Sequence, residues 1–298
     1  MAVDPTSLTP LTGGWSGETF LAEVAGVRQV VRIHARDPRR AEVDAALLRL
    51  VRGLVPVPDV LEVRRADPAA DLPALLVTSW VEGQRGDVLL PTLGNAERAV
   101  VGTRVGDLVA TLGGMPMPVF GEFTDDRLTL EPWSLPDGLP GFVADHEAAL
   151  THWSDDERTG LAEVAEVAQR LLDTVERRCL VHSDLNPKNW LVDPATLEIT
   201  ALLDWEFAHA GHPFSDLGNA LRFEREPAWT DAVLGAYAAR RGTPPAKALG
   251  LARAADLWAL VDLAARRGQN PVADRAHDLL LGIARRRDAG WTLSQTRT

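Results

Sequence analysis

The stretch Leu180–Asp193, LVHSDLNPKNWLVD, holds one histidine, two aspartates and two asparagines in a short apolar frame. Asp184 and Asn189 are five residues apart, and Pro187 restricts the backbone between them. Aspartate, asparagine and proline are also common turn formers. These residues alone are compatible with three interpretations: a catalytic loop, a metal-binding site for hydrolysis, or an ordinary turn between a helix and a strand.

The residues that follow this stretch predict a β-hairpin. WLVD, PATL and EITALLD have the pattern of a strand, a turn and a second strand that ends at Asp204. Because a hairpin folds back, we expect Asp204 to return near Asn189. Two carboxylates and one carboxamide oxygen are hard ligands that suit Mg²⁺, with phosphate oxygens and water completing its shell. A carboxylate outside that shell could orient, or take a proton from, an attacking hydroxyl, as phosphoryl transfer requires.

The composition is that of an ordinary globular protein. Of the 298 residues, 46% are hydrophobic and 24% are charged. No apolar run approaches the roughly 18 residues of a membrane span, and the first residues lack the pattern of a secretory signal. A single cysteine, Cys179, excludes an intramolecular disulfide and favours a reducing compartment. We therefore expect a cytoplasmic protein that is not inserted in a membrane.

The negative charge bears on the choice of partner. The net charge is −11, which argues against nucleic acid as the main partner. Acidic residues are concentrated between Phe120 and Gly160, a segment that contains ten carboxylates and two arginines. Such a run could attract a cationic substrate, or it could simply be a solvated surface.

The pattern of apolar residues changes along the chain. Residues 1–82 alternate like strands and carry one helical segment, RRAEVDAALLRLV. Residues 83–298 have mainly helical spacing, and one helix is expected to start at Ser154, where Glu157 completes a capping box. We therefore predict an α+β fold with a small β-rich N-terminal lobe and a larger, mainly helical C-terminal lobe.

Two segments, VHSDLNPKNWLVD and LLDWEFAHAGHPFSDLGN, resemble the aminoglycoside phosphotransferase family, the small-molecule kinases of the protein-kinase-like fold. The resemblance implies a nucleotide-binding lobe over residues 1–82 and a catalytic and substrate-binding lobe over residues 83–298. Two positions depart from the family pattern: Ser183 replaces a glycine and His212 replaces an aspartate. We interpret both as marks of a subfamily, without a role in the chemistry.

The resemblance also implies roles for individual residues. Asp184 would be the catalytic base, and His182 would brace the loop around it. Asn189 and Asp204 would be the Mg²⁺ ligands. Asp216, in SDLGN, resembles the buried aspartate that supports the catalytic loop.

The nucleotide would be bound by the N-terminal lobe. Its phosphates would lie against the loop LTGGWSGETF, and a cation on the third strand, Arg32, would contact them. Either Glu42 or Asp44 would be the acidic partner of that arginine. Adenine would meet the backbone of the segment between Ser79 and Val81. The predicted nucleotide-binding residues are Gly14, Ser16, Gly17, Arg32, Glu42, Ser79 and Val81.

The function implied is an O-phosphotransferase that uses ATP (or GTP) and Mg²⁺ to phosphorylate a hydroxyl of a small molecule. The expected acceptor is an antibiotic of the aminoglycoside, macrolide or basic peptide type. If the acidic segment between Phe120 and Gly160 attracts the acceptor, the acceptor is cationic. A metabolic kinase acting on choline, homoserine or a sugar amine is the nearest alternative. A nucleotide-binding pseudokinase and a metal-dependent phosphoester hydrolase are alternatives of other classes. The expected oligomeric state is a monomer or a homodimer.

Overall fold

The computed structural model describes residues 8–11, 18–135, 137–150 and 152–290. Contacts between residues divide the chain into two compact units. The first, here called the β-rich unit, comprises Met1–Glu97, Gly121–Pro132 and Asp184–Ala210. The second, the helical unit, comprises Arg98–Phe120, Trp133–Ser183 and Gly211–Thr298. The lobe boundary expected at residue 82 stays a prediction.

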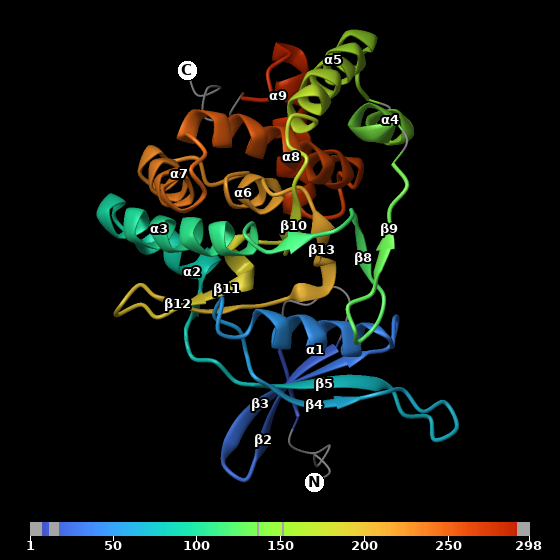
Figure 1. The fold of residues 1–298 in the computed structure, drawn as a ribbon, viewed down its shortest axis with the longest axis vertical. Helices are drawn as coiled ribbons and strands as arrows, with labels where there is room; N and C mark the ends of the chain where they lie inside the picture. The colour runs from blue at the N-terminus through green and yellow to red at the C-terminus, as the bar shows by residue number, and fades with distance from the viewer. Residues whose placement is uncertain (1–7, 12–17, 136, 151, 291–298) are drawn as a thin grey trace. The chain divides into compact units, whose positions relative to one another are not determined.

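The β-rich unit contains an antiparallel sheet with the strand order β1-β2-β3-β5-β4. Figure 1 labels four of its strands, β2 to β5. Its strands are β1 Thr9–Pro10, β2 Glu18–Val24, β3 Val27–His34, β4 Val60–Arg64 and β5 Ala74–Ser79. A two-residue turn joins β2 to β3, and its residues Ala25 and Gly26 both have positive φ, at 52° and 78°. This is the left-handed geometry that suits the twist of a tight hairpin, since glycine adopts it without a steric penalty.

Helix α1 (Arg40–Val51) packs against β4 and β5 of this sheet (Figure 1). The helix buries an apolar stripe that includes Val43, Leu47 and Val51. The sheet contributes its own buried cluster, in which Val31 and Val77 are 4% and 2% exposed. Burial of this apolar surface is the main stabilising contribution to the unit. Strand β3 lies at the centre of the sheet, between β2 and β5.

The predicted hairpin after the opening stretch is confirmed. Strand β11 (Trp190–Val192) pairs with β12 (Ile199–Leu202) and, on its other side, with β6 (Gln84–Arg85), all antiparallel. The short helices around this sheet are α2 Gly86–Leu89, η2 Leu90–Thr92, η4 Pro187–Asn189 and η5 Trp205–Phe207. A second small sheet pairs β13 (His209–Gly211) with β8 (Gly121–Phe123), and β8 with β9 (Leu130–Pro132).

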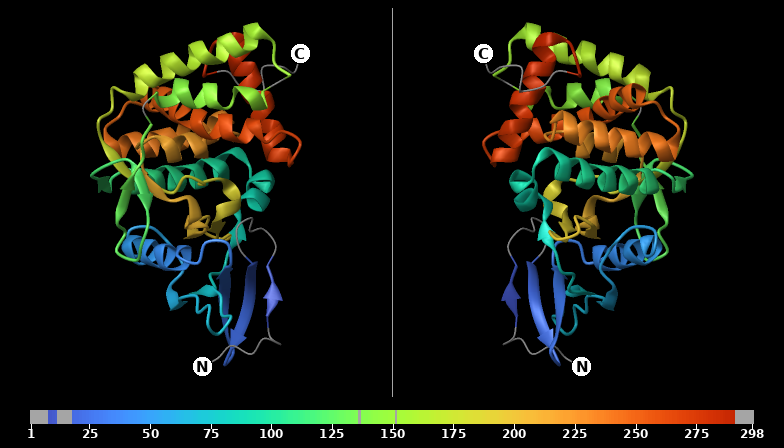
Figure 2. Two further views of the ribbon diagram at one scale, coloured as in Figure 1. Left: turned by 90° about the vertical axis from the view of Figure 1, so that its right-hand side faces the viewer. Right: turned by 90° about the vertical axis from the view of Figure 1, so that its left-hand side faces the viewer.

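Helices make up most of the helical unit, and α5, α8 and α9 lie packed against one another within it (Figures 1 and 2). The predicted capping box is confirmed at the start of α5, where the Ser154 side chain accepts from the Glu157 backbone and Glu157 returns a bond to the Ser154 backbone. The helices are α3 Asn95–Leu112, α4 Gly138–Asp145, η3 Glu147–Ala149, α5 Asp155–Leu172, α6 Ser215–Ala220, α7 Pro227–Arg241, α8 Pro245–Ala265 and α9 Pro271–Arg286. Two short strands, β7 (Pro116–Met117) and β10 (Arg178–Val181), pair with each other.

The predicted α+β class is therefore confirmed: an antiparallel sheet near the N-terminus precedes a mainly helical C-terminal part. Among the described residues, no helix is both long and apolar enough to cross a bilayer.

Candidate active site

Asp184 begins the loop that leads into β11, and three side chains of that loop hold its carboxylate. The Asn189 amide nitrogen donates to Oδ2 of Asp184 at 2.7 Å and to its backbone oxygen at 2.8 Å. The Asn186 amide donates to Oδ1. Asn186 also caps the turn η4, because its Oδ1 accepts from the Lys188 backbone at 3.1 Å. The loop thus fixes the orientation of a carboxylate that is 19% exposed.

Lys188 is the third side chain at Asp184, and sequence reasoning gave it no role. Its Nζ lies 3.4 Å from Oδ2 of Asp184, and its side chain is 37% exposed. The turn η4 brings the two together across a spacing of four residues. Lysine is rare in this sequence: Lys188 and Lys247 are its two instances, beside many arginines.

Asn189 and Asp204 come together as predicted from the hairpin. The Leu203 backbone nitrogen donates to the Asn189 backbone oxygen at 2.7 Å, which puts the next residue, Asp204, beside the loop. Asn189 is buried, at 5% exposed, and its amide nitrogen is directed at Asp184. Its carboxamide oxygen therefore points away from that carboxylate, since the two atoms lie on opposite sides of the amide carbon.

Arg32, from the centre of β3, forms ion pairs with two carboxylates. Its Nη1 donates to Oδ1 of Asp204 at 2.7 Å, and its Nη2 donates to Oε2 of Glu206 at 2.5 Å. Asp204 has a left-handed backbone, with φ of 62°, and the turn η5 follows it directly. This bend after β12 directs Asp204 and Glu206 to the same guanidinium. All three side chains are less than one-fifth exposed.

Burial and neighbouring charges have opposing effects on the pKa values of Glu206 and Arg32. Burial raises the pKa of Glu206 to about 7, with a further increase from Asp204, while Arg32 lowers it. Burial acts to lower the pKa of Arg32, but the charges of Asp204, Glu206 and Asp44 outweigh it and raise that pKa. Arg32 therefore carries a permanent positive charge that holds two carboxylates together.

The two expected acidic partners of Arg32, Glu42 and Asp44, both form ion pairs with other arginines. Glu42 lies in α1 but pairs with Arg65 at 2.5 Å. Asp44 pairs with Arg40 at 2.7 Å, and burial raises the pKa of Asp44 to about 6. Arg32 itself forms ion pairs with Asp204 and Glu206, and the charge of Asp44 also raises the pKa of Arg32.

Sequence reasoning missed Glu206, which stands two residues after Asp204 in the segment DWE. The turn η5 turns its side chain back towards β3, and such a bend is not visible in a strand pattern.

His182 and Asp216 belong to the helical unit. The Asp216 carboxylate accepts from the backbone nitrogens of His182 at 2.9 Å and Ser183 at 2.8 Å. His182 is completely buried, and Asn219 donates to the Ser183 backbone oxygen at 3.3 Å. Asp216 thereby fixes the backbone that directly precedes Asp184, which agrees with the bracing role expected for it.

Five further residues are predicted to bind the nucleotide: Gly14, Ser16, Gly17, Ser79 and Val81. Gly14, Ser16 and Gly17 fall outside the described residues. Ser79 is the last residue of β5, and its backbone nitrogen donates to the Asp59 backbone oxygen at 2.8 Å. Val81 is part of the irregular connection between β5 and β6. Their contact with adenine stays a prediction.

The donor atoms present fit a magnesium ion of the kind expected. Among the described residues, no group of three or more histidine, cysteine, aspartate or glutamate side chains is arranged to hold a metal. The Asn189 carboxamide oxygen and the Asp204 carboxylate are two hard ligands, and Mg²⁺ takes few protein ligands when phosphate oxygens and water supply the rest. Because Arg32 bonds to Oδ1 of Asp204, Oδ2 is the oxygen better placed for a cation.

Three comparisons relate the sequence and the fold of this chain to known proteins. A model of the phosphotransferase enzyme family matches residues 7–253. The chain is similar in fold to a thermostable mutant of aminoglycoside phosphotransferase APH(4)-Ia, solved with ADP and hygromycin B, with a TM-score of 0.69, 20% identity and coverage of 95% of both chains. It is also similar to the GDP complex of aminoglycoside 2'-phosphotransferase-IIIa, with a TM-score of 0.65, 16% identity and coverage of 96% of this chain and 94% of that one.

A shorter similarity involves curated proteins. Over 55 residues the chain is 38% identical to acyl-CoA dehydrogenase family member 11 of Rattus norvegicus, a match that covers 18% of this chain and 7% of that protein. The corresponding protein of Mus musculus is 36% identical over the same length. The shared segment therefore spans a small part of those longer proteins.

The solved structures agree with the predicted protein-kinase-like fold. The family match covers most of the sequence and confirms the predicted enzyme class, a phosphotransferase. The chain belongs to the phosphotransferase enzyme family.

Proposed function

We propose that this protein transfers the terminal phosphoryl group of ATP, or of GTP, to a hydroxyl of a small molecule. The observation that carries the proposal is the fixed orientation of Asp184. Three neighbouring side chains bind its carboxylate, and Asp216 anchors the backbone just before it. A carboxylate that must accept a proton at one point in space requires this kind of preorganisation.

The chain's own residues divide the work. Asp184 orients the acceptor hydroxyl and takes its proton as the new bond to phosphorus forms. Arg32 supplies a permanent positive charge for the nucleotide phosphates, and Glu206 and Asp204 hold its guanidinium in place. A Mg²⁺ ion bound by Asn189 and Asp204 would neutralise phosphate charge. Catalysis then comes from positioning and from charge stabilisation.

The acceptor class is proposed from both the sequence and the neighbours. The solved neighbours include a ternary complex with ADP and hygromycin B, and a complex with GDP. An antibiotic of the aminoglycoside, macrolide or basic peptide type is our leading acceptor. A metabolite such as choline, homoserine or a sugar amine is the alternative, since the same catalytic residues serve either. A cytoplasmic location and a monomeric or homodimeric state stay predictions.

The test is a screen for nucleotide-dependent mass gain. Purified protein, ATP or GTP, and MgCl₂ are incubated with a panel of antibiotics and hydroxylated metabolites, and products are analysed for a gain of about 80 daltons, the mass of one phosphoryl group. Asp184→Asn keeps the shape of the side chain and should reduce turnover by about three orders of magnitude or more. Asp231→Asn, on an exposed position of α7, is the matched control.

Two outcomes would contradict this function. If no acceptor gains mass, nucleotide still binds, and Asp184→Ala leaves the residual nucleotide turnover unchanged, the protein is a pseudokinase. If phosphate is released from phosphoesters without nucleotide, it is a hydrolase.

A further inference from the structure

Ser183 directly precedes Asp184 and has a left-handed backbone, with φ of 71°. Glycine adopts this conformation without a steric penalty, whereas the Cβ of a serine makes it unfavourable. A strained backbone persists when the surrounding structure holds it, and such residues are concentrated at functional sites. The contacts that hold Ser183 in this conformation therefore bear on the position of Asp184.

Helix α6 contacts both sides of Ser183. On the amino side, the Asp216 carboxylate accepts from the backbone nitrogens of His182 and Ser183, at 2.9 Å and 2.8 Å. On the carbonyl side, Nδ2 of Asn219 donates to the Ser183 backbone oxygen at 3.3 Å. That oxygen belongs to the peptide group that joins Ser183 to Asp184, and a peptide group is planar. Asn219 therefore fixes the plane from which the backbone of Asp184 begins.

Asn219 is buried, at 6% exposed, and its carboxamide is only partly satisfied. Its nitrogen binds Ser183, but its Oδ1 is buried and has no donor among the residues that the structure describes. A buried polar atom without a partner is unfavourable, so an apolar side chain of similar size would be less costly at this position. The bond to Ser183 is the contact that such an apolar side chain could not make.

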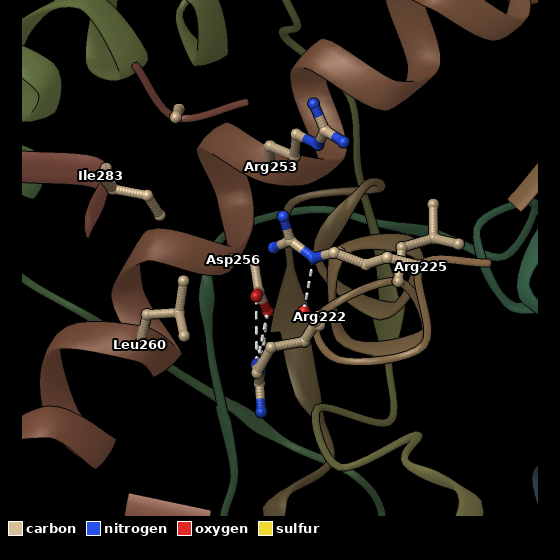
Figure 3. Close-up of a pocket in the computed structure, with 9 residues that line it drawn as sticks. Arg222, Arg225, Arg253, Asp256, Leu260 and Ile283 are labelled. Carbon is tan, nitrogen blue, oxygen red and sulfur yellow. Dashed lines mark hydrogen bonds and ion pairs between the residues drawn. The ribbon is translucent and has the colours of Figure 1, made fainter. Parts of the chain in front are cut away.

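Helix α6 is a firm support for these contacts because it packs closely against α8. A Cβ at Gly218 would lie 2.3 Å from the Ala252 backbone oxygen, so the two helices touch at this point. Just after α6, Arg222 donates to both carboxylate oxygens of Asp256 on α8, and Figure 3 shows this pair. Arg222 is 7% exposed and Asp256 is 4% exposed. The helix that supports the loop is therefore fixed on α8 within the helical unit.

We propose that Asn219 is a positioning residue for Asp184. Together with Asp216, it prevents Ser183 from relaxing to the negative φ that serine prefers. Without its bond, the peptide group before Asp184 rotates and displaces the carboxylate that accepts the proton of the acceptor hydroxyl. This inference rests on the proposed function, in which Asp184 has that role.

A double-variant cycle tests the coupling between Asn219 and Ser183. Asn219→Ala removes the amide, Ser183→Gly removes the strain, and the double variant removes both. Because glycine adopts a positive φ readily, Ser183→Gly should make the amide of Asn219 dispensable. Asp71→Gly is the matched control, since it relieves a left-handed backbone, with φ of 54°, at an exposed turn of the β-rich unit.

The first measurement is steady-state kinetics with the acceptor found in the mass screen. Asn219→Ala should lower kcat about tenfold and leave the KM for nucleotide within about twofold, because the lost bond acts on the proton acceptor and not on the phosphates. Ser183→Gly alone should keep kcat within about twofold of the wild type. Added to Asn219→Ala, it should restore kcat to within about threefold of the wild type, and Asp71→Gly should restore nothing.

The second measurement, amide hydrogen exchange, needs no acceptor. The protection of the His182 amide, which donates to Asp216, should fall about tenfold in Asn219→Ala. The protection should recover when Ser183→Gly is added, and it should not recover when Asp71→Gly is added. These changes report on the loop itself, whichever molecule is phosphorylated.

Several results would overturn the proposal. A loss of kcat that Ser183→Gly does not restore would mean that Asn219 has a general packing role in α6. Unchanged kcat and protection in Asn219→Ala would mean that Asp216 positions the loop alone. If the wild type phosphorylates no acceptor, the proposed function fails, and hydrogen exchange alone then decides whether Asn219 holds Ser183. If Asn219→Ala does not fold, Asn219→Leu, which keeps the volume of the side chain, takes its place in the cycle.

Discussion

Arg32 and Glu206 are 174 residues apart in the sequence, and their side chains form an ion pair of 2.5 Å between Nη2 and Oε2. The same guanidinium binds Asp204 at 2.7 Å. Two carboxylates that bind the strand arginine thus come from the end of β12 and from the turn that follows it. This origin links the proposed phosphate-binding cation directly to a proposed Mg²⁺ ligand.

Glu206→Gln should weaken nucleotide binding by about 10- to 100-fold, because it removes one charged hydrogen-bond partner of a mostly buried arginine. Isothermal titration with the Mg²⁺–nucleotide complex measures the change. Glu42→Gln is the matched control, since Glu42 pairs with the exposed Arg65, and it should change affinity less than twofold. If Glu42→Gln is the more damaging variant, α1 supplies the functional partner after all.

Lys188→Gln should reduce kcat by no more than about fivefold, because a partly exposed ion pair contributes little. The affinity for nucleotide should stay the same, since the lysine contacts Asp184. Steady-state kinetics on the acceptor identified by the screen measures both quantities. Lys247→Gln, at the exposed start of α8, should leave both unchanged. A loss of nucleotide affinity in Lys188→Gln would instead assign this lysine to the phosphates.

The stability of the protein should depend on His212 in acid. Burial lowers the pKa of His212 to about 4, below the ordinary value of 6.5. The unfolded chain then binds more protons than the folded protein between about pH 6.5 and pH 4. The contribution of His212 is present above pH 6.5 and is lost as the pH falls through this window.

Chemical denaturation at a series of pH values measures this dependence. His212→Gln should show a shallower fall in the free energy of unfolding between pH 6.5 and pH 4 than the wild type. His152→Gln, at an exposed position, should follow the wild-type slope. A slope that is the same in all three proteins would mean that His212 does not contribute to the acid sensitivity.

Gly86→Ala should destabilise the loop that carries Asn189. A Cβ at position 86 would lie 2.2 Å from the ring of Trp190, which is buried and directly follows Asn189. Displacement of this ring should lower the free energy of unfolding by about 1–3 kcal/mol and reduce turnover. Gly235→Ala, in the middle of α7 with nothing within 4 Å of the new atom, should stabilise by up to about 1 kcal/mol. Denaturant titration of both variants provides the comparison.

Local patterns predicted the parts of this protein that depend on neighbours in the sequence. The hairpin of β11 and β12 follows from alternation and a short turn, and the start of α5 follows from Ser154 and Glu157. The partner of Arg32 could not be predicted in this way, because it depends on how a left-handed Asp204 redirects the chain. Helical spacing left Glu42 and Asp44 as equal candidates for the acidic partner of Arg32. In the structure, Glu42 forms an ion pair with Arg65 and Asp44 forms one with Arg40.

The shared guanidinium of Arg32 has a consequence for how mutations at this site combine. Removal of Asp204 leaves Arg32 bound to Glu206, and removal of Glu206 leaves it bound to Asp204. Each carboxylate therefore masks part of the loss of the other, and the two single-variant effects will not add up to the effect of the pair. The full contribution of the ion pairs of Arg32 can be measured only in a double variant that replaces both Asp204 and Glu206.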